Sequence, residues 1–396
     1  MGIKEGSTIR GLKVHSILGK GSFATVYEVE GKNNQKFAMK VIKKSKLSNE
    51  KMIQQFNLEC TVMEEIKHPN VLHIFDKFDT NKKHILLLEL CQEDMKDYPI
   101  RRKQFTKRCV PEPLALLFFM QMVNGVSHLH TQGYIHRDLK LENIFLTKDM
   151  KVIVGDLGEA FKGAESGSIA GSQFISAPEA LRAFDTNDSN VVYNHKMDIW
   201  SLGCCLYALL FYKNKYMARD NAETLKLILA DSGQNLVFDE APNPISEEVK
   251  DLLRCMLEPD PNMRINWQGI FNHPVFNNRI RLEDLEKYEI PKKTAIATWG
   301  CFDLNKKFKD ENIHIKSDEE LKMEAENIMK NLFNNMGDLL KKLGEDDGDD
   351  EDEEEDEDNE ENEDYLKKLE NFHNNDWDNF FEENPEFSND FMRMIN

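Results

Sequence analysis

The feature that most constrains this chain is an apolar segment near the middle of its 396 residues. Residues 198–211, DIWSLGCCLYALLF, are apolar on every side of the helix that they would form. A helix without a polar face is either buried in a large protein or spans a membrane. The continuous apolar run, about 202–212, is too short to cross a bilayer. The segment therefore predicts a buried helix at the centre of a sizeable helical domain.

The residues before and after this helix differ in their hydrophobic pattern. Residues 8–90 contain short runs with period-2 alternation, which favours strands, and one long helix over 51–66 that Pro69 ends. From about 112 to 276 the pattern is mostly helical. We therefore predict an α+β fold in two lobes. A small sheet-rich lobe with one long helix precedes a larger helical lobe, and the two join near residues 89–94.

Charge is distributed very unevenly along the chain. The net charge is −20, but residues 1–280 carry +2 and residues 281–396 carry −22. A tail of one sign repels nucleic acid and anionic membranes, so we expect neither as a partner. Seven cysteines without a CxxC pair disfavour a disulfide scaffold or a zinc ribbon. Together with an N-terminus that lacks an apolar signal region, they favour an intracellular protein, cytoplasmic or nuclear.

The C-terminal part divides into four segments by composition. Residues 277–316 are expected to be a linker, and residues 317–344 an amphipathic helix with a capping box at Ser317 and Glu320. Residues 345–364 contain 17 acidic residues of 20 and are expected to be disordered. Residues 365–396 combine aromatic and acidic side chains. This pattern suits either a short interaction motif or plain disorder.

Several residues in the first lobe suit a phosphate-containing ligand. Gly19 and Gly21 lie between two strand-like runs, where glycines let backbone N–H groups approach a phosphate. Lys40, on the next strand, would point under this loop and bind phosphate oxygens. It would need an anionic partner. Glu59 on the following helix is the natural one, with Glu64 and Glu65 as alternatives.

The segment HRDLKLEN, residues 136–143, combines an acid, a base and an amide at a spacing that serves one reaction. Asp138 can orient a hydroxyl and accept its proton, and Lys140 can neutralise charge on a phosphoryl group. Asn143 and Asp156 offer oxygen ligands that suit Mg²⁺. The sequence thus indicates a phosphoryl-transfer site.

These motifs together resemble the eukaryotic protein kinase family over about residues 9–276. They are, in order, GKGSFATV, FAMK, HRDLKLEN, DLG, Ala177-Pro178-Glu179, DIWSLG and Arg264 before HPVF. The resemblance implies the two-lobed kinase fold, with lobes at about 9–90 and 95–276. LKLEN is similar to serine/threonine kinases, and other segments resemble the polo-like, NEK and ULK groups without matching one throughout.

The resemblance implies ATP and Mg²⁺ as cofactors and assigns roles to individual residues. The catalytic set would be Asp138, Lys140, Lys40 and Glu59, and the metal ligands Asn143 and Asp156. The nucleotide would contact Leu18, Gly19, Gly21, Val26, Ala38, Lys40, Leu88, Glu89, Cys91, Asp94 and Phe145. Among these, Leu88 would be the gatekeeper, and the ribose contact could fall one residue from Asp94. Glu179 would pair with Arg264, and Asp198 would brace the catalytic loop.

The resemblance also implies a function. It favours a serine/threonine protein kinase that transfers the γ-phosphoryl group of ATP to protein substrates. The alternative is a pseudokinase scaffold that binds nucleotide or partners, which the presence of Lys40, Asp138 and Asp156 disfavours. Leu157 and Glu159 depart from the family pattern around Asp156, where Phe and an apolar residue are commoner, but neither change removes a catalytic group.

Two regulatory expectations complete the interpretation. Ser168 lies nine residues before Ala177, where related kinases carry a phosphate that Arg137 would bind; Ser166 and Ser172 are alternatives. A basic cluster, formed by Arg101, Arg102, Lys103, Lys107 and Arg108, is expected to be a solvated loop. It could also receive the acidic tail. The tail would then regulate by docking within the molecule, or it would recruit a partner protein.

Overall fold

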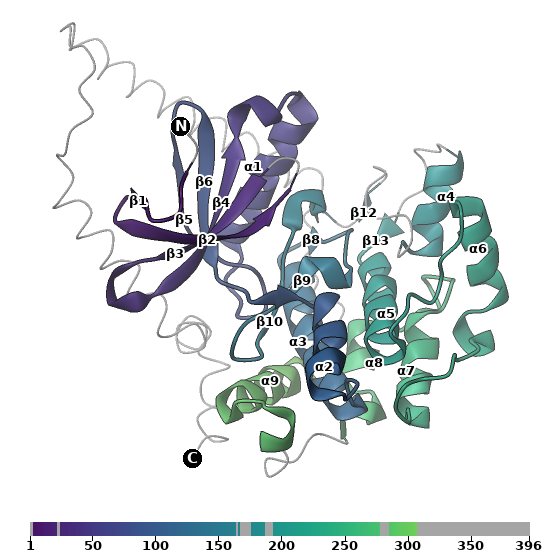
Figure 1. Cartoon of the computed structure of the whole chain (residues 1–396). Coiled ribbons are helices and arrows are strands. Elements are labelled where there is room, and N and C mark those ends of the chain that lie inside the picture. The colour runs from purple at the N-terminus through teal and green to yellow at the C-terminus, as the bar shows by residue number, and fades with distance from the viewer. Residues whose placement is uncertain are drawn as a thin grey trace, which may run out of the picture.

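The computed structural model describes residues 3–21, 24–163, 165–166, 176–186, 193–277 and 285–306 (Figure 1). The expected helix at 317–344, the acidic run at 345–364 and the tail at 365–396 lie outside these residues, as do Ser168 and Ser172. The chain forms a small β-rich lobe and a larger helical lobe, so the predicted two-lobed fold is confirmed. Within the described residues, no helix has the length and apolar character needed to cross a membrane.

The small lobe is a six-stranded sheet with helix α1 beside it (Figure 1). The strands, in sheet order, are β1 (Thr8–Ile9), β2 (Leu12–Lys20), β3 (Ala24–Glu30), β4 (Lys36–Lys43), β6 (Lys83–Glu89) and β5 (Ile74–Asp79). All neighbours are antiparallel. Helix α1 spans Glu50–Glu65 and begins where the Asn49 side chain accepts a hydrogen bond from the Met52 N–H at 2.9 Å.

The side chains of β4 alternate between the two faces of the sheet, and this alternation decides on which face Lys40 lies. Phe37, Met39 and Val41 enter an apolar cluster on one face of the sheet. Ala38 and Ile42 belong to the main core on the other face, which α1 covers. Successive side chains of a strand point to opposite faces, so Lys40 lies on the α1 side.

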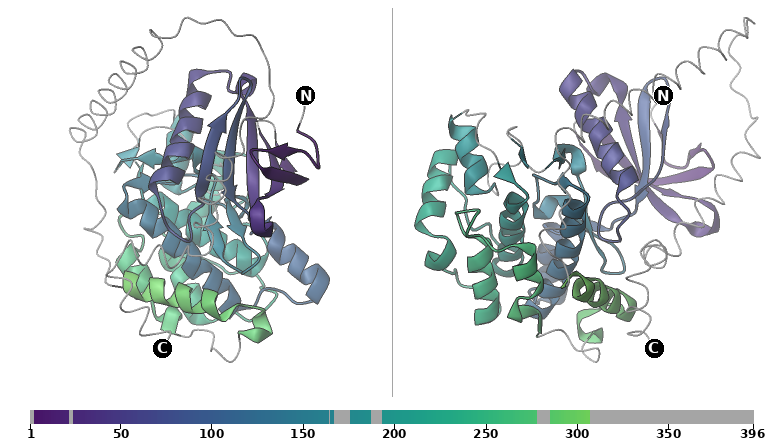
Figure 2. Two further views of the ribbon diagram at one scale, coloured as in Figure 1. Left: turned by 90° about the vertical axis from the view of Figure 1, so that its left-hand side faces the viewer. Right: turned by 180° about the vertical axis from the view of Figure 1, so that it is seen from behind.

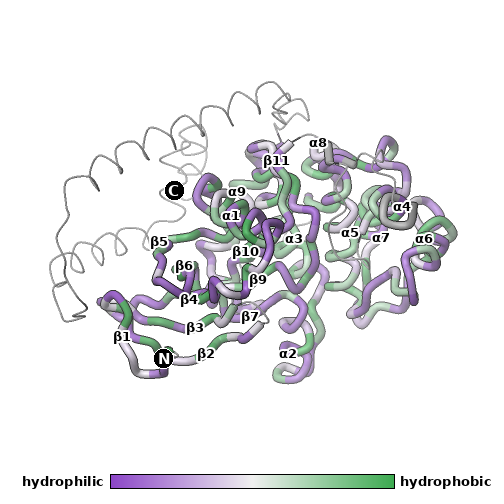
Figure 3. The backbone as a smooth tube through the Cα atoms, turned by 90° about the horizontal axis from the view of Figure 1, so that it is seen from above, coloured by the Kyte–Doolittle hydropathy of each residue, from purple (hydrophilic) through white to green (hydrophobic). Residues whose placement is uncertain are grey.

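The large lobe is built around buried helices. Its helices are α2 (Asp97–Thr106), α3 (Glu112–Thr131), α4 (Pro178–Thr186), α5 (Lys196–Phe211), α6 (Asn221–Ala230), α7 (Glu247–Met256), α8 (Trp267–Phe271) and α9 (Lys292–Asn305). Helices α3 and α5 are largely apolar (Figure 3). Every residue of α5 after Lys196 is buried, as the apolar segment predicts. Helix α5 packs against α3 and α7.

Short strands and turns of the large lobe carry the residues between these helices. The strands form three small sheets: β7 (Glu93–Asp94) with β9 (Ile144–Leu146) and β10 (Val152–Val154), β8 (Tyr134–Ile135) with β11 (Phe161–Lys162), and β12 (Glu165–Ser166) with β13 (Tyr193–Asn194). The single-turn 3₁₀ segments of the large lobe are η3 (Leu141–Asn143), η4 (Leu157–Glu159), η5 (Gly233–Asn235), η6 (Pro274–Asn277) and η8 (Glu286–Tyr288), and those of the small lobe are η1 (Lys32–Asn34) and η2 (Lys44–Lys46).

The segment after α1 anchors the small lobe on the large one. The Asn70 side chain donates to the Val152 carbonyl at 2.8 Å, and its main-chain oxygen accepts from Val154 N at 2.9 Å. Helix α3 approaches this segment at Gly125, where a Cβ would lie 2.5 Å from the Asn70 carbonyl oxygen. Only glycine permits such a close approach. The break that Pro69 makes in the sequence is therefore a fixed junction between the lobes.

Two segments differ from the sequence-based expectation. Part of the expected linker at 277–316 forms helix α9, which packs against α3 and α8 (Figure 2). Its apolar residues do not form a single stripe, and its stability comes from burial of Ala295, Thr298 and Phe302 rather than from helix propensity. The expected solvated loop with the basic cluster is instead mostly helix α2.

Candidate active site

Lys40 and Glu59 form an ion pair between β4 and α1. Lys40 Nζ lies 2.7 Å from Glu59 Oε1. Burial alone would lower the pKa of Lys40, but the attraction of Glu59 and the weaker attraction of Asp156 outweigh it and raise the pKa. Of the other two carboxylates considered as partners, Glu64 pairs with Lys77 at 2.7 Å. The structure therefore selects Glu59, and it keeps the Lys40 ammonium charged.

Asp138, Lys140 and Asn143 form one hydrogen-bonded group in the loop between β8 and β9. Lys140 Nζ lies 2.6 Å from Asp138 Oδ2. Asn143 Nδ2 donates to the same Oδ2 at 2.9 Å and to the Asp138 carbonyl at 2.8 Å. The Asp138 carboxylate is thus held by two neighbours of the same motif, with the ammonium of Lys140 beside it.

Asp198, at the first turn of α5, fixes the backbone before Asp138. Its Oδ2 accepts from the His136 N–H at 2.7 Å and from His130 Nε2 at 2.8 Å, and its Oδ1 accepts from the Arg137 N–H at 2.9 Å. Burial alone would raise the pKa of Asp198, but these hydrogen bonds hold it below its ordinary value. The Trp267 indole N–H donates to His130 Nδ1 at 3.0 Å, so Nε2 of this histidine carries the proton. Asp198 therefore braces the loop that carries Asp138, as expected.

The turn at 156–158 presents a second carboxylate. Asp156 has φ +56° and is exposed, and Leu157 beside it is buried. His136 Nε2 donates to the Gly155 carbonyl at 3.0 Å, which ties this turn to the loop that carries Asp138. A Cβ at Gly155 would lie 2.7 Å from the Phe145 ring, so glycine is required there. Leu157 is part of the main apolar core, so the residue after Asp156 is packed.

The residues present fit a divalent cation with oxygen ligands. The Asn143 amide nitrogen makes the two hydrogen bonds to Asp138, so its Oδ1 points elsewhere as a neutral oxygen donor. The exposed Asp156 carboxylate is the charged donor. An amide and a carboxylate oxygen are the few protein ligands that Mg²⁺ accepts beside phosphates and water.

The residues expected to contact the nucleotide come from both lobes, on the β2–β3 hairpin, β3, β4, β6, the segment after β6, β7 and β9. Leu18, Gly19 and Gly21 are exposed on the β2–β3 hairpin, whereas Ala38 and Leu88 are buried in the sheet and pair directly with each other. The remaining positions are Val26 on β3, Glu89 at the end of β6, Cys91 after it, Asp94 on β7 and Phe145 on β9.

Asp94 has a local structural role. Its Oδ1 accepts from the N–H groups of Lys96 and Asp97, at 3.0 and 2.9 Å, at the start of α2. Burial raises its pKa, and the nearby carboxylates of Asp97 and Glu142 contribute to this shift.

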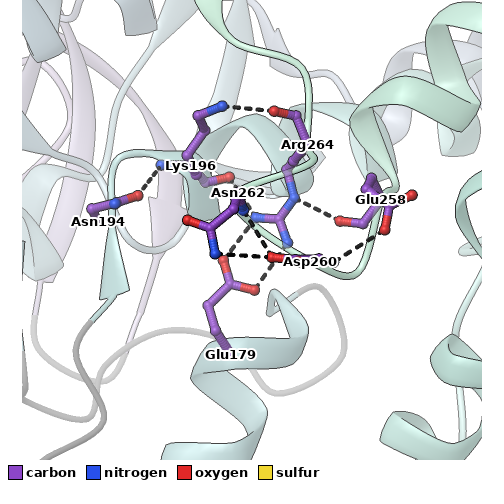
Figure 4. Close-up of polar contacts among 7 residues, drawn as sticks. All are labelled: Glu179, Asn194, Lys196, Glu258, Asp260, Asn262 and Arg264. Carbon is purple, nitrogen blue, oxygen red and sulfur yellow. Dashed lines mark hydrogen bonds and ion pairs between the residues drawn. The ribbon is translucent and has the colours of Figure 1, made fainter.

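A buried ion pair lies in the large lobe, between α4 and the segment before α8. Arg264 NH1 and NH2 bind Glu179 Oε1 and Oε2 at 2.7 and 2.9 Å (Figure 4). Arg264 Nε donates to the Glu258 carbonyl at 2.9 Å, and Lys196 Nζ donates to the Arg264 carbonyl at 2.6 Å. The expected pair between Glu179 and Arg264 is therefore present, and it ties α4 to α5 and to the segment before α8.

Sequence reasoning missed two long-range contacts at the site. Lys151 Nζ lies 2.6 Å from Glu89 Oε1, and Gln55 Nε2 donates to Glu159 Oε1 at 2.6 Å. The departure from the family pattern at Glu159 was a signal for the second contact. Arg137, expected to bind a phosphate, has its Nε 2.6 Å from the Glu159 carbonyl, and its guanidinium lies 5.4 Å from the Phe161 ring centre.

A different group of potential metal ligands lies far along the chain. Ligand atoms of Asp251, Cys255 and His273 lie within 4.8 Å of one another. His273 Nδ1 accepts from the Val275 N–H at 3.3 Å, so Nε2 carries the proton and donates to Asp251 at 3.3 Å. A hydrogen bond accounts for this arrangement.

The comparisons with known proteins agree with the geometry. A family model of the protein kinase domain matches residues 12–276. Serine/threonine-protein kinase PLK4 of Danio rerio is 31% identical over 281 residues, 69% of this chain and 28% of that protein. Cell division control protein 7 of Schizosaccharomyces pombe is 32% identical over 293 residues, 71% of this chain and 26% of that protein. Serine/threonine-protein kinase cds1 of the same yeast is 31% identical over 270 residues, 65% of this chain and 57% of that protein.

The chain spans less than two thirds of the length of these curated relatives. The similarity covers the two lobes described above. The chain belongs to the eukaryotic protein kinase family, among the serine/threonine kinases.

Proposed function

We propose that this protein is an active serine/threonine kinase that transfers the γ-phosphoryl group of ATP to a hydroxyl of a protein substrate. The observation that carries the proposal is the Lys40–Glu59 ion pair beside an intact Asp138–Lys140–Asn143 group. A protein that used the fold only as a scaffold would need neither the ion pair nor the Asp138–Lys140–Asn143 group. We place the protein inside the cell, since its seven cysteines are free thiols, as in a reducing compartment.

Each residue has a defined task in this reaction. Asp138 orients the substrate hydroxyl and accepts its proton while the oxygen bonds to the γ-phosphorus and the bond to the ADP oxygen breaks. Lys140, 2.6 Å from Asp138 Oδ2, balances charge on the transferred group. Lys40 binds phosphate oxygens of the nucleotide. A magnesium ion held by Asn143 and Asp156 would neutralise further phosphate charge.

Transfer of labelled phosphate from ATP to a generic protein substrate tests this function. We expect Asp138→Asn to lower kcat by about a hundredfold to ten-thousandfold, because the substrate hydroxyl loses its base. Glu240→Gln, which removes the charge of an exposed carboxylate between η5 and α7, is the control and should keep full activity. If the unmodified protein binds ATP but transfers no more phosphate than Asp138→Asn, the chain is a pseudokinase scaffold.

We further propose that phosphate at Ser168 regulates the enzyme through Arg137. Arg137 directly precedes the proposed catalytic base, so a phosphate that contacts it would couple the segment around Ser168 to Asp138. Mass spectrometry of active protein should find this phosphate. Full activity of Ser168→Ala would refute the regulation, and Ser166→Ala and Ser172→Ala test the alternatives.

We also propose that the acidic tail docks on the end of α2. Arg102 is buried, and the Arg101 guanidinium binds Glu93, so the five-residue basic cluster is not one exposed surface. Lys103, Lys107 and Arg108 remain exposed there, next to the exposed side chain of Phe105. These three charges and one aromatic ring suit a segment that is both acidic and aromatic.

Deleting residues 317–396 tests this docking. We expect the deletion to change activity or substrate preference, and the change to shrink as salt is raised, because exposed charge pairs are screened. Neutralising Lys103, Lys107 and Arg108 together should reproduce the effect of the deletion, whereas neutralising Lys226, an exposed lysine of α6, should not. Equal rates for full-length and truncated enzyme on a short peptide at every salt concentration would show that the tail only recruits a separate protein.

A further inference from the structure

Glu159 directly follows the turn at 156–158 and connects two parts of the active site. Its Oε1 accepts a hydrogen bond from Gln55 Nε2 on α1 at 2.6 Å. Its main-chain oxygen accepts from Arg137 Nε, also at 2.6 Å, and Arg137 directly precedes Asp138. One residue therefore joins α1 to the catalytic loop, through its side chain on one side and its backbone on the other.

Helix α1 is held on both sides of the residue that must reach Lys40. Gln55 lies about one helical turn before Glu59 and so shares a face with it. At the end of the helix, Glu65 Oε2 accepts a hydrogen bond from the Tyr134 hydroxyl at 2.5 Å. Gln55 and Glu65 are about 15 Å apart along the helix axis, at 1.5 Å per residue. The two contacts with the large lobe thus bracket Glu59.

The Gln55–Glu159 contact depends on the chemistry of both side chains. Both are half-buried, and a hydrogen bond to a charged carboxylate is stronger than one between neutral groups. An apolar residue at 159 could not accept the amide proton. Arg137 is supported independently by the Phe161 ring, 5.4 Å from its guanidinium carbon. The side-chain contact of Glu159 therefore acts on α1, and its main-chain contact acts on the loop.

We propose that Glu159 and Gln55 are positioning residues for phosphoryl transfer. Their hydrogen bond keeps α1 where Glu59 reaches Lys40, and it couples that position to the loop that carries Asp138. Neither residue touches the reacting atoms. The inference rests on the proposed kinase activity, so its test includes a measurement that does not need catalysis.

The kinetics of substituted enzymes test the role of the Gln55–Glu159 hydrogen bond. Gln55→Ala and Glu159→Ala are each expected to lower kcat about tenfold, equivalent to about 1.4 kcal/mol, with KM for the protein substrate within about twofold. A swapped enzyme with Gln55→Glu and Glu159→Gln exchanges donor and acceptor and should recover kcat to within about threefold. The matched control is Gln54→Ala, since Gln54 is exposed on α1 and its amide binds Glu50 of the same helix at 3.3 Å; it should keep full activity.

Hydrogen exchange of the amides in residues 50–65 is measured on the same proteins without substrate. Exchange should be faster in both single variants than in Gln54→Ala, and restored in the swapped enzyme. Single variants with kcat within twofold of the unmodified enzyme, or a swapped enzyme as slow as either single variant, would overturn the proposal. If the unmodified protein has no transferase activity, the proposed function fails. Unchanged hydrogen exchange in the single variants would then separately overturn the claim that the Gln55–Glu159 hydrogen bond holds α1 in place.

Discussion

Lys151 and Glu89 form an ion pair that links the β9–β10 turn to the segment joining the two lobes. Lys151 Nζ lies 2.6 Å from Glu89 Oε1, and the side chains are only 12% and 8% exposed. In the same turn, the Asp149 carbonyl accepts a hydrogen bond from Thr294 of α9 at 2.8 Å. Helix α9 therefore supports the β9–β10 turn, and Lys151 in this turn binds Glu89 at the end of β6. The adenine of a nucleotide is expected to bind there.

Lys151→Met should destabilise the protein and weaken nucleotide binding. Removing one partner leaves a nearly buried carboxylate without this counter-charge, which costs about 3–5 kcal/mol for a buried pair. Chemical denaturation measures the loss, and we expect KM for ATP to rise several-fold. Lys148→Met, on the exposed part of the same turn, is the control. Unfolding free energies within about 0.5 kcal/mol for the two variants would contradict this account.

Lys40→Met should abolish most transferase activity without unfolding the large lobe. The ammonium of Lys40 is the group that binds Glu59, and methionine keeps most of the apolar stem of the side chain without its charge. The control is Lys36→Met on the same strand, whose exposed ammonium pairs with Glu28 at 2.6 Å instead. Near-normal kcat in Lys40→Met would show that this lysine has no part in the reaction.

Two glycine substitutions should separate ligand binding from folding. A Cβ at Gly19 would meet no atom within 4 Å, so Gly19→Ala should keep the thermal stability of the protein. If phosphates bind under this hairpin, the added methyl group should still raise KM for ATP. Gly155→Ala should instead lower the melting temperature, because its Cβ would lie 2.7 Å from the Phe145 ring. Thermal unfolding and ATP titration of both variants check these outcomes, and a normal KM in Gly19→Ala would place the phosphates elsewhere.

His68 should make the protein less stable in mild acid. Burial, with His128 and Lys151 nearby, holds the pKa of His68 well below its ordinary value of 6.5. Its Nδ1 accepts the Asn70 N–H at 3.0 Å, a bond that the protonated ring could not make. Since the unfolded chain takes up a proton as pH falls through about 6.5 and the folded chain does not, the stability that neutral His68 provides is present above that pH and lost below it.

Chemical denaturation between pH 7.5 and 5.5 measures this dependence. In His68→Asn, whose amide oxygen can replace Nδ1 as acceptor, the unfolding free energy should fall less steeply, by up to about 1.4 kcal/mol per pH unit below pH 6. His195, whose pKa burial lowers to about 3, keeps some of the slope in the variant. Parallel curves for the two proteins would show that His68 does not contribute.

Much of the fold followed from local pattern. The apolar segment at 198–211 predicted the buried helix α5, and the period-2 runs predicted the sheet of the small lobe. The motif at 136–143 brought Asp138, Lys140 and Asn143 together because their spacing is only five residues, so the local backbone nearly fixes their contacts. Helix α9 was missed because burial against α3, and not its own residue pattern, makes it a helix.

The sequence by itself determined the two-lobed architecture, the family and the residues that could carry phosphoryl transfer. Only the tertiary structure decided that Glu59, and not Glu64 or Glu65, meets Lys40, and that Glu159 holds Gln55 across 104 residues of chain. It also decided that Arg102 is buried while its neighbour Lys103 is exposed. The physical reason is that a short motif fixes the relative positions only of side chains that lie a few residues apart along the chain. Contacts between distant segments depend on how whole helices and strands pack, because a change of one residue in register exchanges the side chain that reaches the partner.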